Sequence, residues 1–424
     1  MAESRKIAVI GAGAAGCFCA IELKRLRPEL EVTVYEAGNT PLAKVSVTGG
    51  GRCNLTNSFE GVSRLEEVYP RGAHLMKRAL RQLSHEDTMR WFSREGVRLT
   101  VQNDGCVFPV SQDAMQIVRT LENLMRRLGV ALECGRRVES IRPGTIGRWD
   151  ICLDGGALVE ADAVIATLGG SSKMVLERMF AGLGLEIADP VPSLFTFKIA
   201  DEGLRSLMGT VVDDVRMSIC GTSFRSGGTL LVTDWGLSGP ATLRLSSYAA
   251  RHLAENKYLA PLCVNWMSSS EAEVCESLSS VAAASPKKMV CNGAALTGGV
   301  LSDRLWKYLV ARAGVRGDCR WAELGSKGLY RLVSVLTSDR YDIEGRARFK
   351  EEFVTCGGIA LSNIDIGTMA SRRHQGLFFA GEVLDVDALT GGFNLQAAWS
   401  TGFVAARSAA NLFQPQSVQP ELEL

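Results

Sequence analysis

The stretch that decides the fold is KIAVIGAGAAG, residues 6–16. Its opening residues are an apolar, β-branched run of the kind that forms a buried parallel strand. The turn GAGAAG follows at once, and apolar residues then recur at helical spacing to about Arg27. A second strand, EVTVYE at 31–36, ends in an acid. Strand, glycine turn, helix, strand and acid form the fingerprint of a βαβ unit that binds a dinucleotide.

Each residue of this fingerprint has a physical role. Gly11 permits the tight turn, Gly13 lets the backbone approach a pyrophosphate, and Gly16 lets helix and strand pack closely. Free N–H groups at the helix N-terminus attract phosphates, and Glu36 would accept hydrogen bonds from the ribose hydroxyls. The alternative is a glycine-rich turn that binds nothing. The predicted contacts are Gly11, Gly13, Ala14, Ala15, Gly16 and Glu36.

A second glycine segment, KVSVTGGGRCNLTN at 44–57, bears on which dinucleotide is bound. A loop of glycines can lie against a flat ring or a phosphate without side-chain clash. Arg52 can hold a phosphate or a substrate carboxylate in a bidentate fork, and polar neighbours add neutral hydrogen-bonding groups. Taken alone, the segment is equally compatible with a flexible turn. The predicted contacts are Lys44, Thr48, Gly49, Gly50, Gly51, Arg52, Cys53 and Asn54.

A third motif, GLFFAGEVLDVDALTGGFNLQAAWSTGFVAAR, occupies residues 376–407. A short strand at 377–380 ends in Gly381-Glu382, a loop follows, and Gly391-Gly392 opens a helix. Flavoenzymes use this arrangement for the rest of FAD: an acid holds ribityl hydroxyls, and the helix N-terminus faces the N1–C2=O edge of the flavin. The alternative is an ordinary strand–turn–helix. The predicted contacts are Gly381, Glu382, Asp385, Gly391, Gly392, Phe393, Asn394 and Leu395.

Between these motifs, short strands are expected at 130–135, 137–142, 148–153 and 158–166. The last strand ends in the turn ATLGG, 166–170. In two-sided FAD folds, a β-meander of this type precedes such a glycine turn. We therefore expect backbone at Val138 to touch adenine and Gly169 to lie beside the cofactor.

The composition and net charge of the chain limit the classes of function that are expected. The chain has 424 residues and a net charge of +1, with no basic region suggesting a nucleic acid or a membrane surface. Its 12 cysteines are scattered, and its 4 histidines stand apart, so neither a disulfide framework nor a metal site is expected. No signal peptide or apolar span is evident. These features favour a reduced, cytoplasmic protein with a small-molecule substrate and leave its oligomeric state open.

GAGAAG, TGGGRCNLTN and FFAGEVLDVDALTGGFNLQAAWSTG together resemble the BaiN-like (YhiN-like) family of bacterial flavoproteins. The stretch LLVTDWGLSGPATLRLS, 230–246, resembles a further family segment, with Asp234 where the family usually has His. The resemblance implies an α/β fold, a glutathione-reductase-like FAD-binding (Rossmann-type) domain interrupted by a β-barrel-like and helical domain. The expected boundaries are 1–190 and 346–412 for the FAD domain, 191–345 for the insertion and 413–424 for a disordered tail.

The resemblance also implies FAD and redox chemistry by hydride transfer at flavin N5. The favoured activity is NAD(P)H-linked reduction of a C=C conjugated to a ketone, on a substrate of the 3-oxo bile acid type. No second GxGxxG is found, so NAD(P)H would bind transiently. The alternatives are an amine oxidase of the aminoacetone type using O2, and a non-catalytic flavin redox sensor or binding protein for modified RNA.

The catalytic residues are not identified by the sequence, and Cys53 and Arg52 are its weak candidates. A thiol beside a flavin could form a charge-transfer pair. Cys53 lacks a C-x-x-C partner, however, so a packing role is the favoured interpretation.

Overall fold

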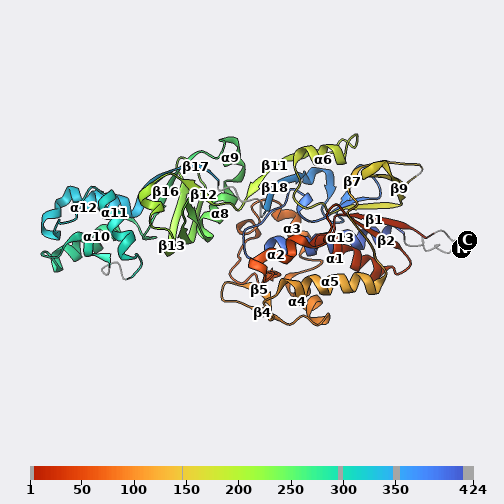
Figure 1. Ribbon diagram of the computed structural model, residues 1–424, viewed down its shortest axis with the longest axis horizontal. Coiled ribbons are helices and arrows are strands. Elements are labelled where there is room, and N and C mark those ends of the chain that lie inside the picture. Colours follow the sequence, from red (N-terminus) through yellow and green to blue (C-terminus); the bar gives the residue numbers. More distant parts are fainter. Residues whose placement is uncertain (1–3, 146, 295–298, 347–353, 414–424) are drawn as a thin grey trace, which may run out of the picture. The chain divides into compact units, whose positions relative to one another are not determined.

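The computed structural model describes residues 4–145, 147–294, 299–346 and 354–413 (Figure 1). The chain divides into two compact units. Unit 1 comprises Met1–Pro190 with Thr355–Leu424, and unit 2 is Val191–Val354. Each unit has its own buried hydrophobic cluster, so each is stabilised by its own core.

The central feature of unit 1 is a seven-stranded sheet in the order β19-β20-β21-β10-β1-β2-β6. Strands β21, β10, β1, β2 and β6 run parallel, and β1 lies between β2 and β10. The fold class expected from the sequence is therefore confirmed. The strand bounds are β1 Lys6–Ile10, β2 Glu31–Glu36, β6 Ala131–Cys134, β10 Ala163–Ala166, β19 Ile364–Asp365, β20 Ala370–Ser371 and β21 Leu377–Phe379.

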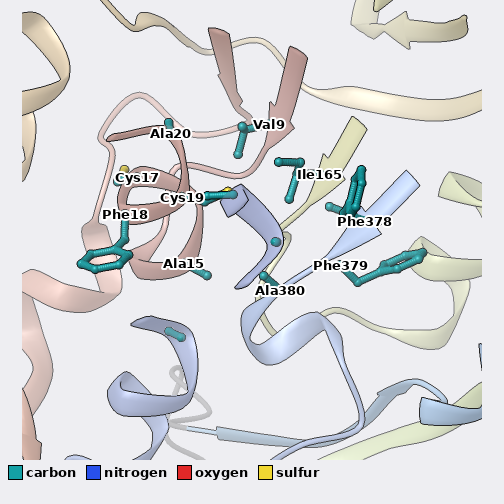
Figure 2. Packing of buried hydrophobic residues seen from close by; sticks show 14 of the residues in the cluster. Val9, Ala15, Cys17, Phe18, Cys19, Ala20, Ile165, Phe378, Phe379 and Ala380 are labelled. Carbon is teal, nitrogen blue, oxygen red and sulfur yellow. The ribbon is translucent and has the colours of Figure 1, made fainter. Parts of the chain in front are cut away.

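Helix α1 (Ala14–Leu26) is buried between this sheet and the terminal helix α13 (Phe393–Leu412). Figure 2 shows its side chains packed in one cluster with residues of β1, β10 and β21. The two helices approach closely, because a Cβ added at Gly402 would lie 2.8 Å from the carbonyl oxygen of Ala15. The other helices of unit 1 are α2 Ala43–Gly51, α3 Ala73–Ala79, α4 His85–Arg94, α5 Ala114–Leu128 and α6 Lys173–Met179.

Two smaller antiparallel sheets complete unit 1, in the orders β3-β5-β4 and β7-β8-β9. The second is the expected meander. The strand predicted at 158–166 is in fact two strands, because its first half joins the meander and its second half joins the large sheet. The bounds are β3 Thr56–Asn57, β4 Leu99–Val101, β5 Cys106–Pro109, β7 Val138–Pro143, β8 Trp149–Leu153 and β9 Leu158–Ala161.

Unit 2 contains a closed barrel in the order β12-β15-β14-β13-β16-β17, sealed by pairing of β12 with β17. Three helices lie among the described residues between 270 and 340, within the insertion that was expected to be partly helical. The strand bounds are β12 Phe197–Ile199, β13 Val211–Ile219, β14 Arg225–Val232, β15 Gly236–Ser238, β16 Ala260–Asn265 and β17 Asp339–Arg346. The helix bounds are α7 Glu202–Arg205, α8 Pro240–Tyr248, α9 Ala250–Glu255, α10 Glu271–Ala284, α11 Asp303–Arg312 and α12 Trp321–Ser338.

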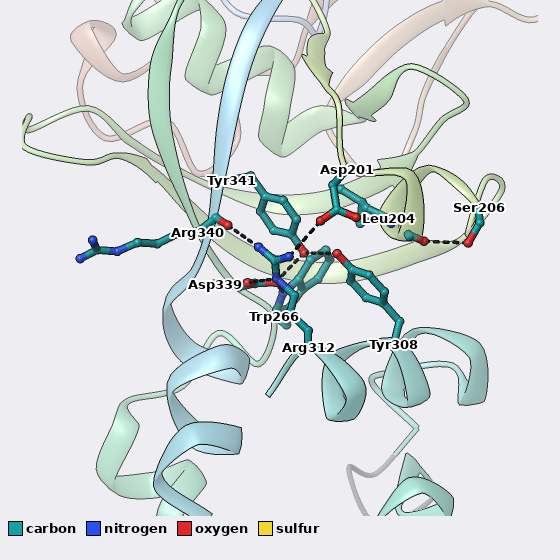
Figure 3. A network of polar contacts seen from close by, with 10 residues as sticks. Asp201, Leu204, Ser206, Trp266, Tyr308, Arg312, Asp339, Arg340 and Tyr341 are labelled. Atoms are coloured by element: carbon teal, nitrogen blue, oxygen red, sulfur yellow. Dashed lines mark hydrogen bonds and ion pairs between the residues drawn. The ribbon is translucent and has the colours of Figure 1, made fainter. Parts of the chain in front are cut away.

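A buried carboxylate ties the helical part of unit 2 to its barrel (Figure 3). Asp339, 3% exposed at the junction of α12 and β17, accepts hydrogen bonds from Trp266 Nε1 at 3.0 Å and Tyr341 at 2.5 Å. The guanidinium of Arg312, on α11, donates to the same carboxylate at 2.6 Å. Burial raises the pKa of Asp339, whereas these hydrogen bonds favour its charged form. The network fixes the direction in which β17 leaves α12.

Two further sequence expectations differ from the structure. Cys220 and Cys263 form a disulfide, although no disulfide was expected. The two cysteines lie 43 residues apart in the sequence, so their proximity could not be predicted from spacing. They come together because β13 and β16 pair as neighbouring strands. Phe413, predicted to begin a disordered tail, is the C-cap residue of α13, and its carbonyl oxygen accepts a hydrogen bond from Arg27 at 3.1 Å. Residues 414–424 lie outside the described residues.

The chain passes between the units along β11 (Ile187–Ser193) and β18 (Val354–Ile359), which form a two-stranded sheet. Across the described part of the chain, every helix is too short or too polar to cross a bilayer.

Candidate functional site: a dinucleotide cradle

The first glycine turn is closed by contacts that only glycine permits. Gly11 has φ +105°, and its N–H donates to the carbonyl oxygen of Tyr35 at 2.8 Å. A Cβ at Gly16 would lie 2.0 Å from the Gly11 carbonyl oxygen and 2.6 Å from Thr167 Oγ1. Thr167 secures the turn by donating to the carbonyl oxygens of Ile10 and Gly11, at 2.9 Å each. Gly11 and Gly16 thus bring α1 against β1 and β10.

Gly13 differs from its neighbours because no protein atom lies within 4 Å of a Cβ added there. It is the N-cap residue of α1, and no side chain caps that helix end. The N-terminal N–H groups of a helix lack intrahelical partners and favour anions. Gly13 therefore borders open space at a helix end suited to a phosphate.

Glu36 ends β2 and orders the loop around the glycines. Its Oε2 accepts from the N–H of Ala12 at 2.9 Å, and its Oε1 accepts from Gly38 at 2.7 Å. The chain preceding Val138 lies beside it, because Arg136 N–H donates to the Glu36 carbonyl oxygen at 2.9 Å. Val138 itself is buried at the start of β7.

The second glycine segment is not the simple loop that the sequence suggested. Helix α2 begins at Ala43 and loses helical geometry from Thr48, after which three successive glycines have positive φ. Thr48 Oγ1 donates to the Val45 carbonyl oxygen at 2.9 Å. Gly50 and Gly51 face open space on the side where a Cβ would project. Lys44 and Arg52 flank this turn and are exposed.

The two catalytic candidates of the sequence lie in different environments. Arg52 is exposed, with its guanidinium carbon 4.4 Å from the centre of the Phe108 ring and its Nε donating to the Gly49 carbonyl oxygen at 3.1 Å. Cys53 is fully buried with φ +62°. Burial raises the pKa of the Cys53 thiol to about 12, so the thiol stays neutral near pH 7.

The third motif contacts the second through an ion pair. Lys44 Nζ lies 3.1 Å from Glu382 Oε2, although 338 residues separate them. The other carboxylate oxygen of Glu382 accepts from Thr355 N–H at 2.9 Å. A Cβ at Gly169 would lie 3.7 Å from Glu382, so the ATLGG turn reaches the same place. Gly381 has φ +76° and touches α1 at Ala15.

The N-terminus of α13 is held against the second segment by Asn54. With its amide oriented to satisfy both groups, Asn54 accepts from Gly392 N–H at 3.2 Å and donates to the Thr56 carbonyl oxygen at 3.0 Å. A Cβ at Gly392 would lie 2.3 Å from that carbonyl oxygen, so only glycine fits. No side chain caps α13. Asn394 instead supports the preceding loop through Ala388 N–H at 2.9 Å.

Sequence reasoning missed three residues that support this loop. Asn57 donates to the Gly391 carbonyl oxygen at 2.9 Å, and the Tyr69 hydroxyl donates to the Phe393 carbonyl oxygen at 2.9 Å. Arg71 forms a two-pronged ion pair with the fully buried Asp387. A single sequence contains no pattern that predicts these contacts, because each residue lies more than 300 positions from the residue that it supports. Asp385 is half-buried in the same loop.

We call the three glycine segments described above, 11–16, 44–57 and 381–395, the cradle. A family model shows to which family the chain belongs. Residues 5–408 match the HI0933-like protein Rossmann domain. The chain belongs to the HI0933-like family. This membership confirms the resemblance drawn from the sequence, together with its prediction of an FAD-dependent oxidoreductase with a Rossmann-type FAD-binding domain.

Relatives of this HI0933-like protein carry different names. It is 27% identical over 413 residues to a 3-dehydro-bile acid delta(4,6)-reductase of Clostridium scindens, covering 96% of this chain and 99% of that one. It is 29% identical over 422 residues to a ribosomal RNA dihydrouridine synthase of Haemophilus influenzae, with the same coverage. A solved 3-ketosteroid-delta4-(5alpha)-dehydrogenase of Rhodococcus jostii aligns with TM-score 0.48 and 15% identity, covering 97% of this chain and 98% of that one.

The residues of the HI0933-like cradle fit FAD. Open space beside Gly13, Gly50 and Gly51 leaves room for a ligand against bare backbone. Two helix N-termini without side-chain caps, those of α1 and α13, offer N–H groups to phosphate and to the flavin edge. Asp234, where the resemblance led us to expect His, lies in unit 2, exposed between β14 and β15.

Proposed function

We propose that this flavoprotein reduces a C=C bond conjugated to a carbonyl, with NAD(P)H as the electron source. The observation that carries the proposal is the meeting of residues 44–57 with residues 381–394, seen in the Lys44–Glu382 and Asn54–Gly392 contacts. These contacts bring the glycines of the second segment close to the glycines that precede α13. A site for the flavin end of FAD requires this proximity.

The residues have separate tasks in this proposal. Gly11, Gly13, Gly16 and the α1 N-terminus hold the diphosphate, and Glu36 holds the adenosine ribose. Glu382 and Lys44 hold the ribityl side, and the α13 N-terminus at Gly392 stabilises negative charge on the adjacent ring edge by about 0.3–2 kcal/mol. Bound FAD would supply two-electron chemistry as hydride transfer. Arg52, exposed beside the second segment, would orient an anionic substrate group.

The names of the relatives support the reaction class. A 3-dehydro-bile acid delta(4,6)-reductase acts on C=C bonds conjugated to a ketone. A dihydrouridine synthase saturates the uracil C5=C6 bond, which is conjugated to the C4 carbonyl. In the reaction that we propose, hydride goes to the β-carbon of the conjugated C=C bond and a proton to its α-carbon. In the net reaction, NAD(P)H, a proton and the C=C bond give NAD(P)⁺ and the saturated CH–CH product.

Anaerobic titration of the yellow protein tests the proposal. We expect NADPH or NADH to bleach the visible band, and a 3-oxo-4-ene steroid or a uridine-containing RNA to restore it with one saturated product per nicotinamide consumed. Mass spectrometry of the substrate would show a gain of two hydrogens. The variant Lys44→Ala should retain the fold and bind FAD more weakly, because Glu382 loses its cationic partner.

Two outcomes would overturn the proposal. Bleaching by aminoacetone or another amine, without any nicotinamide, would establish amine oxidation with O2 as the acceptor. Failure of every conjugated acceptor to restore the colour after reduction by NAD(P)H would leave a redox sensor as the better description.

A further inference from the structure

The near-neutral charge of the chain conceals a strongly basic segment in unit 2. Residues 286–331 carry nine Lys or Arg and three Asp or Glu, a surplus of six positive charges in a chain whose net charge is +1. This segment spans α11, the start of α12 and the strand-like stretch that precedes them. This segment belongs to the helical part of unit 2.

The fold gathers these cations on one surface. The stretch 286–290 runs antiparallel to 319–322, because Trp321 N–H donates to the Lys288 carbonyl oxygen at 3.0 Å and Val290 N–H donates to the Cys319 carbonyl oxygen at 2.9 Å. Arg331 reaches the connection between α11 and α12, where its Nη1 would lie 3.6 Å from a Cβ at Gly314. We call the exposed cations so gathered the basic surface: Lys287, Lys288, Arg316, Arg320, Lys327 and Arg331.

Two acids of the segment lie close to the basic surface, and both have partners. Asp318 lies 3.3 Å from Arg316, and Glu323 is engaged by the backbone N–H of Arg320 at 3.1 Å. Within the described residues, no carboxylate forms an ion pair with Lys287, Lys288 or Lys327, and none with Arg331. Unneutralised cations at this density attract a polyanion with spaced phosphates.

An exposed aromatic ring lies within the same surface. Tyr330 is 65% exposed and lies three residues after Lys327 on α12, so the two side chains share a helix face. Met289, 45% exposed, is paired with Arg320 through a β-bridge. Exposed rings beside cations serve as stacking platforms for unpaired bases, which a lipid surface or inorganic phosphate would not use.

We infer that the basic surface of unit 2 binds RNA, with its cations on the phosphates and Tyr330 stacked on an unpaired base. The inference rests on the proposed function, since it makes a uracil ring within RNA the conjugated substrate. It reverses the expectation, based on average charge, that nucleic acid is not a partner. The dihydrouridine synthase relatives cover nearly the whole chain and are consistent with it.

Fluorescence anisotropy with the full-length, FAD-loaded protein tests the inference. The probe is a labelled RNA stem-loop with unpaired uridines. Charge reversal in Lys287→Glu/Lys288→Glu/Arg331→Glu should weaken binding by about 10- to 100-fold and reduce the salt slope by about two, since each phosphate contact on a single strand contributes about 0.7. The neutral triple variant, with Gln at each position, should lose about half as much on a logarithmic scale.

A matched control reverses Arg94, Arg98 and Arg126, three exposed cations of unit 1, and should bind RNA as the parent does. Tyr330→Ala should weaken binding to the stem-loop several-fold and leave binding to a blunt duplex unchanged, whereas Tyr330→Phe should behave as the parent. Both triple variants should keep the parent rate of flavin reduction by NADPH.

The outcomes separate this inference from the proposed function. Equal RNA affinity of the parent and the Lys287/Lys288/Arg331 variants would overturn the basic surface, even if a steroid enone still reoxidised the flavin. Equal affinity for heparin or for phosphatidylserine vesicles at the same salt would also overturn it, because the surface would then be a general anion binder. Loss of RNA binding with unchanged NADPH bleaching would support it.

Discussion

Gly13 and Gly16 stand three residues apart in one motif, yet the structure gives them different physical tasks. Gly13→Ala should leave the free energy of unfolding of the cofactor-free protein nearly unchanged, because its Cβ meets nothing within 4 Å. It should still weaken FAD binding by at least about tenfold, since the methyl group would occupy the side from which a phosphate approaches. Equilibrium dialysis of FAD and urea denaturation would measure the two effects.

Gly16→Ala is the matched comparison for that prediction. Its Cβ would lie 2.0 Å from a backbone oxygen, so α1 must move away from β1. We expect a loss of about 1–3 kcal/mol in unfolding free energy even without cofactor, as for other overpacked core positions. Equal destabilisation by Gly13→Ala and Gly16→Ala would contradict the assignment of open space at Gly13.

Cys53 makes unfolding sensitive to alkaline pH. Its ordinary pKa is 9.0, and burial raises it to about 12 in the folded chain. The unfolded chain releases the proton first, so this contribution to stability is complete below pH 9 and is lost as pH rises toward 12. Comparing wild type with Cys53→Ala, the fall in unfolding free energy between about pH 8 and pH 10 should be about 1.4 kcal/mol smaller in the variant.

That experiment also bears on catalysis. If Cys53 packs rather than reacts, Cys53→Ala should keep its yellow colour and its reduction rate by NADPH within about threefold, a change equivalent to less than 1 kcal/mol. A loss of several hundredfold in that rate, with FAD still bound, would restore the thiol as a catalytic candidate.

At the scale of elements, α13 depends on a buried polar cluster as well as on its apolar face. Gln396 is fully buried, donating to Thr88 Oγ1 at 3.0 Å and Ser400 Oγ at 2.8 Å and accepting from Thr56 at 2.5 Å. Gln396→Leu would leave these hydroxyls short of partners, so we expect about 2–4 kcal/mol of destabilisation. Gln396→Glu keeps an acceptor for Thr56. This variant should lose less unfolding free energy at acidic pH, where the new carboxyl group is protonated, than at neutral pH.

Urea denaturation monitored by circular dichroism would measure both variants of Gln396. A Gln396→Leu protein as stable as the parent would show that the cluster is dispensable.

Elements with strong local patterns were predictable from the sequence. The order of β1, α1 and β2 follows from apolar periodicity and glycine spacing, and β21 and α13 follow in the same way. The helical start of α2 was missed, because a run of glycines outweighs the preceding AKVSV in any local reading. The pairings of Asn54 with Gly392 and Lys44 with Glu382 could not be predicted, because they depend on the tertiary fold.

At the scale of the whole molecule, averages over the chain do not show how charges and cysteines are distributed. A net charge of +1 suggested that no polyanion would bind, although residues 286–331 alone carry a surplus of six. The disulfide between Cys220 and Cys263 was missed for a related reason, since scattered spacing in sequence says nothing about neighbours in a barrel. The charge surplus can be counted in a short window of the sequence, whereas the cysteine pair becomes visible only in the folded chain.

Two separate hydrophobic cores predict two unfolding transitions. Calorimetry of the full-length protein should resolve one transition for each unit, and added FAD should raise only that of unit 1. At a free FAD concentration of about 100 times Kd, the stabilisation should be about 2.7 kcal/mol. A single transition that shifts as a whole with FAD would show that the two cores unfold cooperatively.

The insertion of unit 2 into unit 1 has a consequence for biosynthesis. The first glycine turn leaves the ribosome early, but β21 and α13, which complete the sheet and cover α1, emerge only after all of residues 191–354. Until these elements have emerged, the side of α1 that packs on α13 lacks its partner and is prone to aggregation. Cofactor loading is thereby deferred until β21 and α13 have been synthesised, and a chain that stops short of them would yield a colourless product.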